Sequence, residues 1–378
     1  MKLTEELLSY YNDHAEEAKE LLMELAQIPA PSHHEEKRAE FCKNWLEQQG
    51  AKGVYIDEAL NVVYPIGDTG SNKLMVFEAH SDVVFPDMEP LPLKVENGRI
   101  YCPGVGDDTA HVVAMLMTAK YIAQNNLQPK DAGVLIIVNS CEEGLGNLKG
   151  TRAIFERYGD RVEEFITFDA FAGRAADRAV GSRRYKVEIA TEGGHSYGAF
   201  GNRNAIAYLA ALINDLYNMK VPTRGKTTYN VGKISGGTSV NTIAQNAEML
   251  YEFRSDDRED LAEMEAHFNA AIDFYRAKGV EVKVTLVGDR PCSGEIDLAR
   301  QQTMKDRVAK ATERYYGIDK MAYHAGSTDC NITLSMGIPA LSVGCKKGFG
   351  THTRGEYIEI DGILPGLKVA GELILFHF

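Results

Sequence analysis

The sequence lacks the features that mark secreted, membrane-spanning and disulfide-stabilised proteins. Its six cysteines are scattered, and none belongs to a Cys-x-x-Cys pair, so we expect free thiols in a reducing cytosol. No stretch approaches the roughly 18 uninterrupted apolar residues that a membrane-spanning helix needs. Residues 1–16 are polar and acidic, without the apolar core of a secretion signal. These absences together predict a cytoplasmic protein.

Positive charge is also scarce. The chain has 41 Lys and Arg residues against 54 Asp and Glu residues, which gives a formal net charge of −13. Because an acidic surface repels nucleic acids and anionic membranes, we expect neither as a partner. Some of the acids could serve as metal ligands, since a bound cation would offset their charge.

The sequence does contain enough apolar material for a large globular protein. Its 378 residues are 44% hydrophobic, and no internal repeat or low-complexity linker is visible. At about 100–200 residues per domain, this length predicts two domains.

Three short apolar runs end in polar residues that could carry chemistry. They are residues 73–79 before His80-Ser81-Asp82, residues 134–138 before Glu142-Glu143, and residues 165–168 before Asp169. Such runs are typical of buried strands, and helical segments lie between them. The pattern predicts an α/β fold with a mixed, mostly parallel sheet flanked by helices. Open sheets of this kind carry their active sites at the carboxyl ends of the strands.

The pattern changes near residue 180. Residues 184–191 alternate between apolar and polar, as a half-exposed antiparallel strand does. The segments up to residue 290 follow in the order β-α-β-β-α-β, the split pattern of a ferredoxin-like domain. We therefore expect residues 180–290 to form an inserted α+β domain. Residues 1–179 and 291–378 are expected to form one catalytic domain.

Each polar motif has an ordinary structural explanation when it is taken alone. His80-Ser81-Asp82 could be a surface loop, and one residue of Asp107-Asp108 a helix N-cap. Glu142-Glu143 could be charge at a helix start, while Asp169 and His352 could be a cap and a loop histidine. Taken together, these side chains are the imidazole and carboxylate ligands of a possible two-metal site. Such ligands suit zinc, with cobalt or manganese as alternatives.

With these motifs in this order, the chain resembles the metallopeptidase family that includes peptidase T, glutamate carboxypeptidase, acetylornithine deacetylase and succinyl-diaminopimelate desuccinylase. The resemblance covers nearly the whole chain. It implies a zinc exopeptidase-like catalytic domain with two zinc ions, and an inserted domain that acts as a lid and dimerisation surface. Residues 140–150 and the strand end at residues 253–255 look most like the peptidase T-like branch.

The resemblance also implies a role for each metal ligand. Asp107 would bridge the two ions. His80 and Asp169 would bind one of them, and Glu143 and His352 the other.

The remaining implied roles concern catalysis and substrate binding. Glu142 would be the general base and later the acid for the leaving amine, and Asp82 would orient His80. His195 would reach the active site of a partner subunit and stabilise the oxyanion there. The residues implied to hold carboxylate or carbonyl groups of the substrate are Asn241 and Arg254, since an arginine fork can bind both oxygens of a carboxylate.

Some positions depart from the family pattern or stay open. Many relatives carry Lys after the aspartate pair, whereas Thr109-Ala110-His111 follows here, which we expect to alter the loop and spare the ligand. His111 lies in a mostly apolar helix and is expected to be buried. Arg354 is either a substrate contact or a surface arginine. Residues 323–329 are expected to form a polar loop, with His324 as a further substrate contact.

The expected activity is hydrolysis of an amide bond. An aminopeptidase or di/tripeptidase acting on small peptides is the first expectation, and an N-acyl-amino-acid deacylase or carboxypeptidase is the alternative. A non-catalytic binding protein of the same fold is a third possibility, against which the presence of Glu142 argues. We expect a homodimer that forms through the inserted domain.

Overall fold

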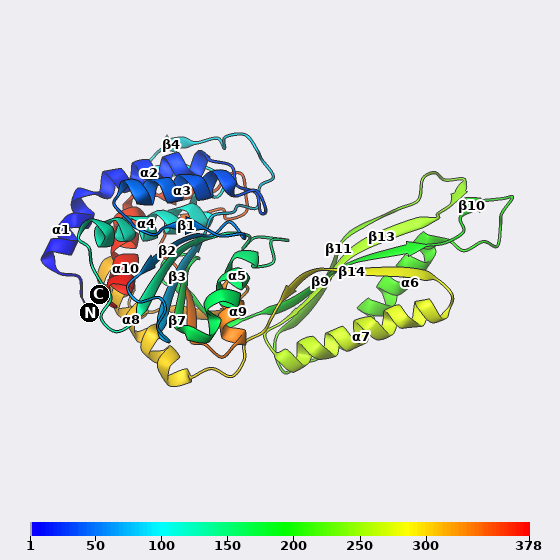
Figure 1. Ribbon diagram of the computed structural model, residues 1–378. Coiled ribbons are helices and arrows are strands. Elements are labelled where there is room, and N and C mark those ends of the chain that lie inside the picture. Colours follow the sequence, from blue (N-terminus) through cyan, green and yellow to red (C-terminus); the bar gives the residue numbers. More distant parts are fainter. Residues whose placement is uncertain (1) are drawn as a thin grey trace. The chain divides into compact units, whose positions relative to one another are not determined.

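The computed structural model describes residues 2–378 and divides the chain into two compact units (Figure 1). The first unit comprises Met1–Ala179 and Gly294–Phe378, and the second comprises Val180–Ser293. The chain thus leaves the first unit once and returns to it once. All six cysteines are free and buried. Among residues 2–378, no helix is both long and apolar enough to cross a membrane.

An eight-stranded sheet forms the centre of the first unit, with the strand order β1-β2-β6-β3-β7-β16-β8-β15. The strands are β1 (Tyr55–Ile56), β2 (Val62–Ile66), β3 (Leu74–His80), β6 (Gly133–Asn139), β7 (Val162–Phe168), β8 (Arg174–Ala179), β15 (Ala322–Gly326) and β16 (Ala340–Val343). Strands β6, β3, β7 and β16 are mutually parallel, whereas β1, β2 and the β16–β8 pair are antiparallel. The predicted mixed, mostly parallel sheet is confirmed.

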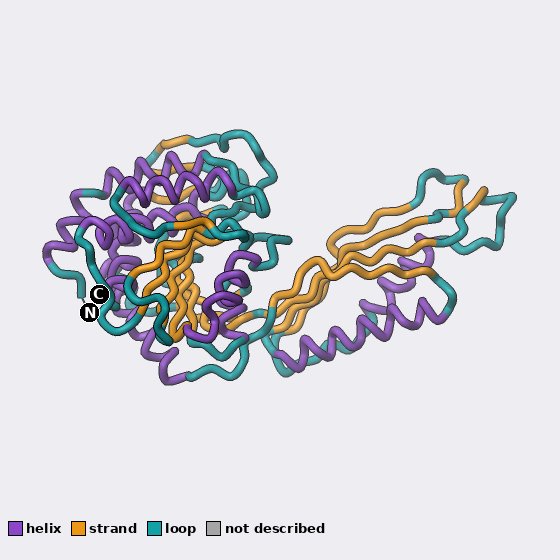
Figure 2. The backbone as a smooth tube through the Cα atoms, viewed as in Figure 1, coloured by secondary structure: helices purple, strands orange, loops and turns teal. Residues whose placement is uncertain are grey.

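Helices cover both faces of this sheet (Figure 2). They are α1 (Glu5–Asp13), α2 (Ala15–Gln27), α3 (Glu36–Gln48), α4 (Ala110–Gln124), α5 (Lys149–Tyr158), α8 (Leu298–Tyr316), α9 (Cys330–Ser335) and α10 (Ile363–Leu375). Alternate side chains of a strand point to opposite faces. Met75 and Phe77 of β3 therefore pack with α2, α4 and α10, while Leu74 and Val76 pack with α5 and α9.

A smaller sheet in the first unit has the order β17-β18-β5-β4. Its strands are β4 (Lys94–Glu96), β5 (Arg99–Tyr101), β17 (Gly348–Phe349) and β18 (Tyr357–Glu359). The predicted hairpin turn at Asn97-Gly98 connects β4 and β5, and both turn residues have positive φ, 51° and 73°. The expectation of a loop at residues 323–329 was partly wrong, because Ala322–Gly326 forms the edge strand β15.

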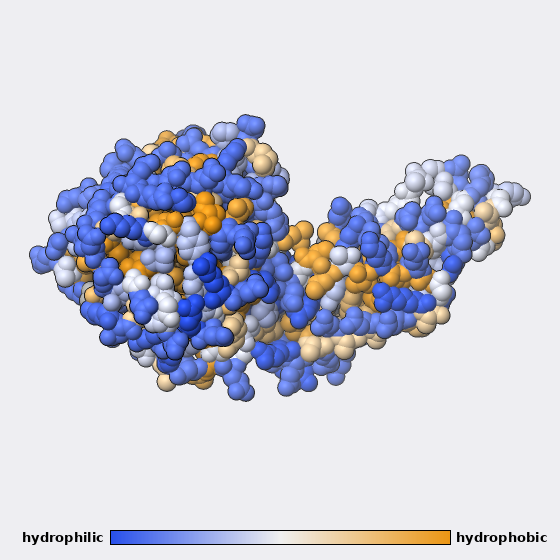
Figure 3. Space-filling model, viewed as in Figure 1, coloured by the Kyte–Doolittle hydropathy of each residue, from blue (hydrophilic) through white to orange (hydrophobic). Residues whose placement is uncertain are grey.

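The second unit has the predicted element order. Its main elements are β9 (Gly181–Ala190), α6 (Ala205–Tyr217), β11 (Thr227–Gly236), β13 (Asn246–Ser255), α7 (Arg258–Ala277) and β14 (Glu281–Arg290). The strands form an antiparallel sheet in the order β11-β13-β9-β14, and side chains of α6 and α7 pack on one face of it. A separate two-stranded ribbon joins β10 (Gly194–His195) to β12 (Thr242–Ile243). The face of the first unit seen in Figure 3 is largely hydrophilic, whereas the visible face of the second unit is a mixture of hydrophilic and hydrophobic residues.

A buried pair of acids lies between the first unit's main sheet and helices α5 and α9. The Thr151 hydroxyl oxygen is 2.8 Å from Glu78 Oε2 and 2.6 Å from Asp329 Oδ1. A hydroxyl has one hydrogen to donate, so at least one of the two carboxyl groups must be protonated to complete both bonds. Burial raises the pKa of Asp329 to about 6 and raises that of Glu78 well above its usual range.

We expect this pair to make stability depend on pH. A carboxyl group whose pKa is raised by folding favours the folded state when protonated, so its contribution is full below the unfolded pKa and is lost as pH rises through the folded value. Relative to Asp329→Asn, the wild type should lose about 1–3 kcal/mol of unfolding free energy between pH 4 and 7. Urea unfolding across that pH range, with chelator present throughout, measures the difference.

Asp319→Asn, at an exposed position, is the matched control and should follow the wild-type pH curve. Parallel pH curves for the wild type and Asp329→Asn would contradict a shared proton in this pair.

Candidate metal centre

Five side chains from distant segments gather at the carboxyl edge of the main sheet. His80 ends β3, Glu143 follows β6, and Asp169 follows β7. Asp107 lies in the irregular turn Val105–Thr109 before α4, and His352 lies in the loop between β17 and β18. His80, Asp107 and Glu143 are buried, while His352 is exposed. Four of these positions precede the second unit, and the fifth follows it.

Asp107 stands between the two histidines. Its Oδ1 atom lies 3.2 Å from His80 Nε2, and its Oδ2 atom lies 3.1 Å from His352 Nε2. Glu143 Oε1 is 2.9 Å from the same His352 nitrogen. The ligand atoms of one group, His80, Asp107, Asp108 and Asp169, are all within 4.8 Å of one another, and Asp107, Glu143 and His352 form a second such group. These two ligand groups share Asp107. His80 also forms a third group of this kind with Glu142 and Glu143.

The carboxylates of the cluster stabilise positive charge on the groups beside them. Burial alone would lower the pKa of His80, but the carboxylates of Asp108 and Asp107 outweigh it and raise that pKa well above its usual range. Hydrogen bonds to Asp107 and Glu143 raise the pKa of His352 to about 10. The protonated imidazoles therefore balance the negative charge of the carboxylates, and metal cations at the same place would do the same. Imidazole nitrogen and carboxylate oxygen are a donor set that zinc accepts, so the residues fit a divalent metal.

Asp82 contacts both His80 and the backbone of the Glu142-Glu143 segment. His80 Nδ1 lies 3.0 Å from the Asp82 carbonyl oxygen and 3.5 Å from its carboxylate, which leaves Nε2 directed at Asp107. The same carboxylate accepts the backbone N–H groups of Glu142 and Glu143, each at 2.9 Å, and the Ser32 hydroxyl at 2.6 Å. Asp82 thus fixes the backbone of the Glu142-Glu143 pair as well as the ring of His80.

Glu356 is a residue that the sequence analysis missed. It is buried, and its carboxylate accepts the backbone N–H groups of Gly104, Gly106 and Asp107 at 2.7, 3.1 and 2.8 Å. These bonds fix the turn that presents Asp107, whose peptide bond to Asp108 is cis. No local pattern in the sequence indicates this contact, because Glu356 lies about 250 residues after the glycine-rich turn that it binds.

The other candidates in the first unit lie outside the two ligand groups. His324 is on the edge strand β15, and its Nδ1 atom is buried without a hydrogen-bond partner. Both terminal nitrogens of Arg354 contact the Asp87 carboxylate, at 2.9 and 2.6 Å, and its guanidinium lies over the ring of Phe85. The structure therefore gives Arg354 a partner within the chain.

Three candidates lie in the second unit. His195, on strand β10, is exposed, and its Nδ1 atom accepts the backbone N–H groups of Tyr197 and Gly198. Asn241 directly precedes strand β12, which pairs with β10, and the backbone carbonyl oxygen of Asn241 accepts the N–H of Ser196. The Arg254 guanidinium binds both carboxylate oxygens of Glu252, each at 3.0 Å.

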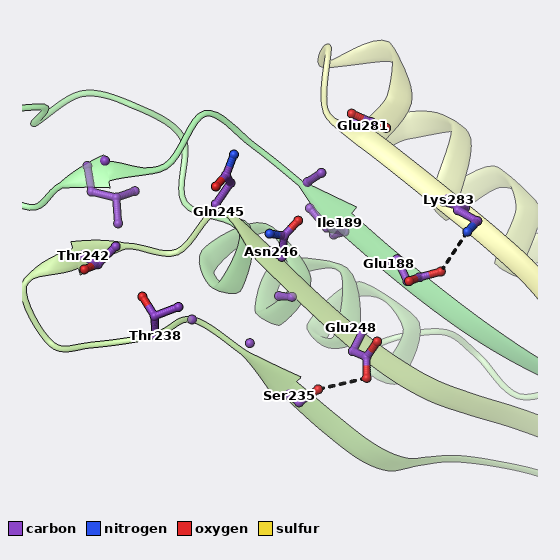
Figure 4. A pocket seen from close by; sticks show the side chains of 16 residues that line it. Glu188, Ile189, Ser235, Thr238, Thr242, Gln245, Asn246, Glu248, Glu281 and Lys283 are labelled. Atoms are coloured by element: carbon purple, nitrogen blue, oxygen red, sulfur yellow. Dashed lines mark hydrogen bonds and ion pairs between the residues drawn. The ribbon is translucent and has the colours of Figure 1, made fainter.

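A cavity of about 650 Å³ also lies in the second unit, beside the β10–β12 ribbon (Figure 4). Acidic side chains dominate its charged lining, with Lys283 paired to Glu188 and Ser235 to Glu248. None of the residues of the two ligand groups lines it. The candidate site is therefore the cluster at the sheet edge.

Comparison with known proteins agrees with this geometry. The chain is 25% identical to the uncharacterized protein YqjE of Bacillus subtilis, over 94% of this chain and 96% of that protein. It is 24% identical to succinyl-diaminopimelate desuccinylase of Corynebacterium glutamicum, over 91% and 92% of the two chains. A tripeptidase structure from Staphylococcus aureus superposes with a TM-score of 0.74 at 22% identity, covering 96% of this chain and 98% of that one. A model of Peptidase family M20/M25/M40 matches residues 76–375. The chain therefore belongs to peptidase family M20/M25/M40 and is a hydrolase that acts on amide bonds.

Proposed function

We propose that the chain is a dinuclear zinc aminopeptidase or di/tripeptidase that cleaves small peptides. The observation that carries this proposal is the position of Asp107, whose two oxygens face the Nε2 atoms of His80 and His352. A carboxylate placed in this way can bridge two cations. In the proposed site, His80 and Asp169 hold one zinc ion, and Glu143 and His352 hold the other. Cobalt or manganese could replace zinc, because both accept the same ligands.

Zinc ions bound there would supply a water nucleophile that is reactive near neutral pH and would polarise the scissile carbonyl. Glu142 is the proposed general base, which takes a proton from the attacking water and returns it to the leaving amine. Its backbone N–H is bonded to the same Asp82 carboxylate as that of Glu143. This shared anchor supports a fixed spacing between the proton acceptor and the metal ligand.

His195 is proposed to stabilise the oxyanion in the active site of a partner subunit. Because Nδ1 of its ring accepts two backbone N–H groups, the neutral ring carries its hydrogen on Nε2. That Nε2–H is available as a donor to a developing oxyanion. Tyr197 and Phe200, in the same loop, are 89% and 91% exposed, which supports a homodimer in which this loop is covered.

An N-acyl-amino-acid deacylase or carboxypeptidase is the second candidate. The fork of Arg254, which binds Glu252 in this structure, could exchange that partner for the carboxylate of an amino-acid substrate. Asn241 lies beyond the other end of β13, so its proposed role toward a substrate carbonyl group is separate from that of Arg254. The relative named succinyl-diaminopimelate desuccinylase also favours this candidate.

The first test of the mechanism is Glu142→Gln. The variant keeps the shape of the side chain but cannot accept a proton as a carboxylate does, so kcat should fall at least about 100-fold. Zinc content, measured by mass spectrometry of the purified protein, should stay near that of the wild type. Glu89→Gln, at an exposed position, serves as the control and should leave both values unchanged. Turnover at the wild-type rate in Glu142→Gln would refute the role of Glu142.

The second test concerns the substrate. With zinc or cobalt present, we expect kcat/KM for Ala-Ala-Ala to exceed that for N-acetylornithine and other N-acetyl amino acids by at least about tenfold, a difference of about 1.4 kcal/mol in transition-state binding. A free amine needs an acidic or carbonyl pocket, whereas an acyl group needs an apolar or amide-binding one. A preference for the acylated substrates would assign the chain to the second candidate.

A further inference from the structure

His111 occupies a fully buried position in the first turn of α4, directly behind the metal cluster. Its Nε2 atom accepts the backbone N–H of Cys345, 3.0 Å away. A peptide N–H can only donate, so Nε2 carries no hydrogen. The ring hydrogen is therefore on Nδ1, where it is donated to Asp108 Oδ1.

The second oxygen of Asp108 continues this line of hydrogen bonds to the metal cluster. Asp108 Oδ2 accepts the backbone N–H of His80 at 3.1 Å. Asp108 is fully buried, so both of its oxygens depend on these partners. A single line of bonds thus runs from Cys345 through His111 and Asp108 to His80, and it joins three segments that are far apart in the sequence.

This line includes His80 and Asp108 of the four-residue ligand group and runs beside its other two members. The backbone N–H of His80 donates to Asp108, and Asp107 directly precedes Asp108 in the chain. The backbone N–H of Asp169 donates to the carbonyl oxygen of Val343 at 3.0 Å, two residues before Cys345. Within residues 2–378, neither Glu143 nor His352 of the other group bonds to His111, Asp108 or Cys345.

We propose that His111 is a positioning residue that holds one of the two metal sites, the one formed by His80, Asp107 and Asp169, in its binding geometry. It does so by fixing the Asp108 carboxylate between two backbone segments. This inference rests on the dinuclear site proposed above. It predicts a selective effect: loss of the His111 bonds weakens the site of His80 and Asp169 much more than the site of Glu143 and His352, which shares only Asp107 with it.

Zinc titration of the metal-free protein by calorimetry tests the selectivity. The wild type should bind two ions. His111→Phe keeps a ring of similar size but removes both hydrogen bonds, so the affinity of one site should fall about 10–100-fold while the other stays within about twofold. His111→Asn can still donate to Asp108 and should recover most of the lost affinity. Thermal unfolding of the metal-free proteins measures any general loss of stability separately.

Asp108→Asn provides an independent variant should His111→Phe fail to fold. Its oxygen can still accept the His80 N–H, but its amide would then face the His111 N–H donor to donor, so it should weaken the same single site. Equal loss of both sites, or of neither, in a folded variant would overturn the proposal. Wild-type protein that binds fewer than two ions would instead refute the dinuclear site.

Discussion

Crowded negative charge at the carboxyl edge of the main sheet is the constraint on which this structure depends. Asp107, Glu143 and Asp169 are brought together where strands of a parallel sheet end, and burial raises the pKa values of Glu143 and Asp169. Such a cluster is costly without compensating cations, because removing charge from water is unfavourable. The surrounding backbone therefore has to hold the carboxylates in an arrangement that a metal can neutralise.

Two buried acids outside the ligand set provide much of that support. Glu356 collects three N–H groups from the turn that carries Asp107, and Asp82 collects two from the Glu142-Glu143 segment. Hydrogen bonds to a charged acceptor are stronger than those between neutral groups, so each acid fixes its loop firmly. The ligands are positioned chiefly by main-chain contacts of these neighbouring carboxylates.

The main sheet and the grouping of the polar motifs were predictable from the sequence, because each apolar run is short, buried and followed within a few residues by its polar residues. His80, Glu142 and Asp169 could be placed at strand ends for that reason. Other features could not be predicted. The binding of Glu356 to Gly104 and the bond between Cys345 and His111 join segments more than 200 residues apart, and no local pattern reports them. Strand β15 was missed because its five residues, Ala-Tyr-His-Ala-Gly, lack the apolar run of a buried strand.

The insertion of the second unit sets an order of events during synthesis. Residues 80, 107, 143 and 169 are made first, followed by all of Val180–Ser293, and then by β16 and the loop that carries His352. Strand β16 pairs with β7, so the sheet beside Asp169 is also unfinished until then. A growing chain therefore carries an incomplete, acidic cluster through the synthesis of an entire domain. The fifth residue, His352, is made only after that domain, so the full ligand set exists only once both units have been synthesised.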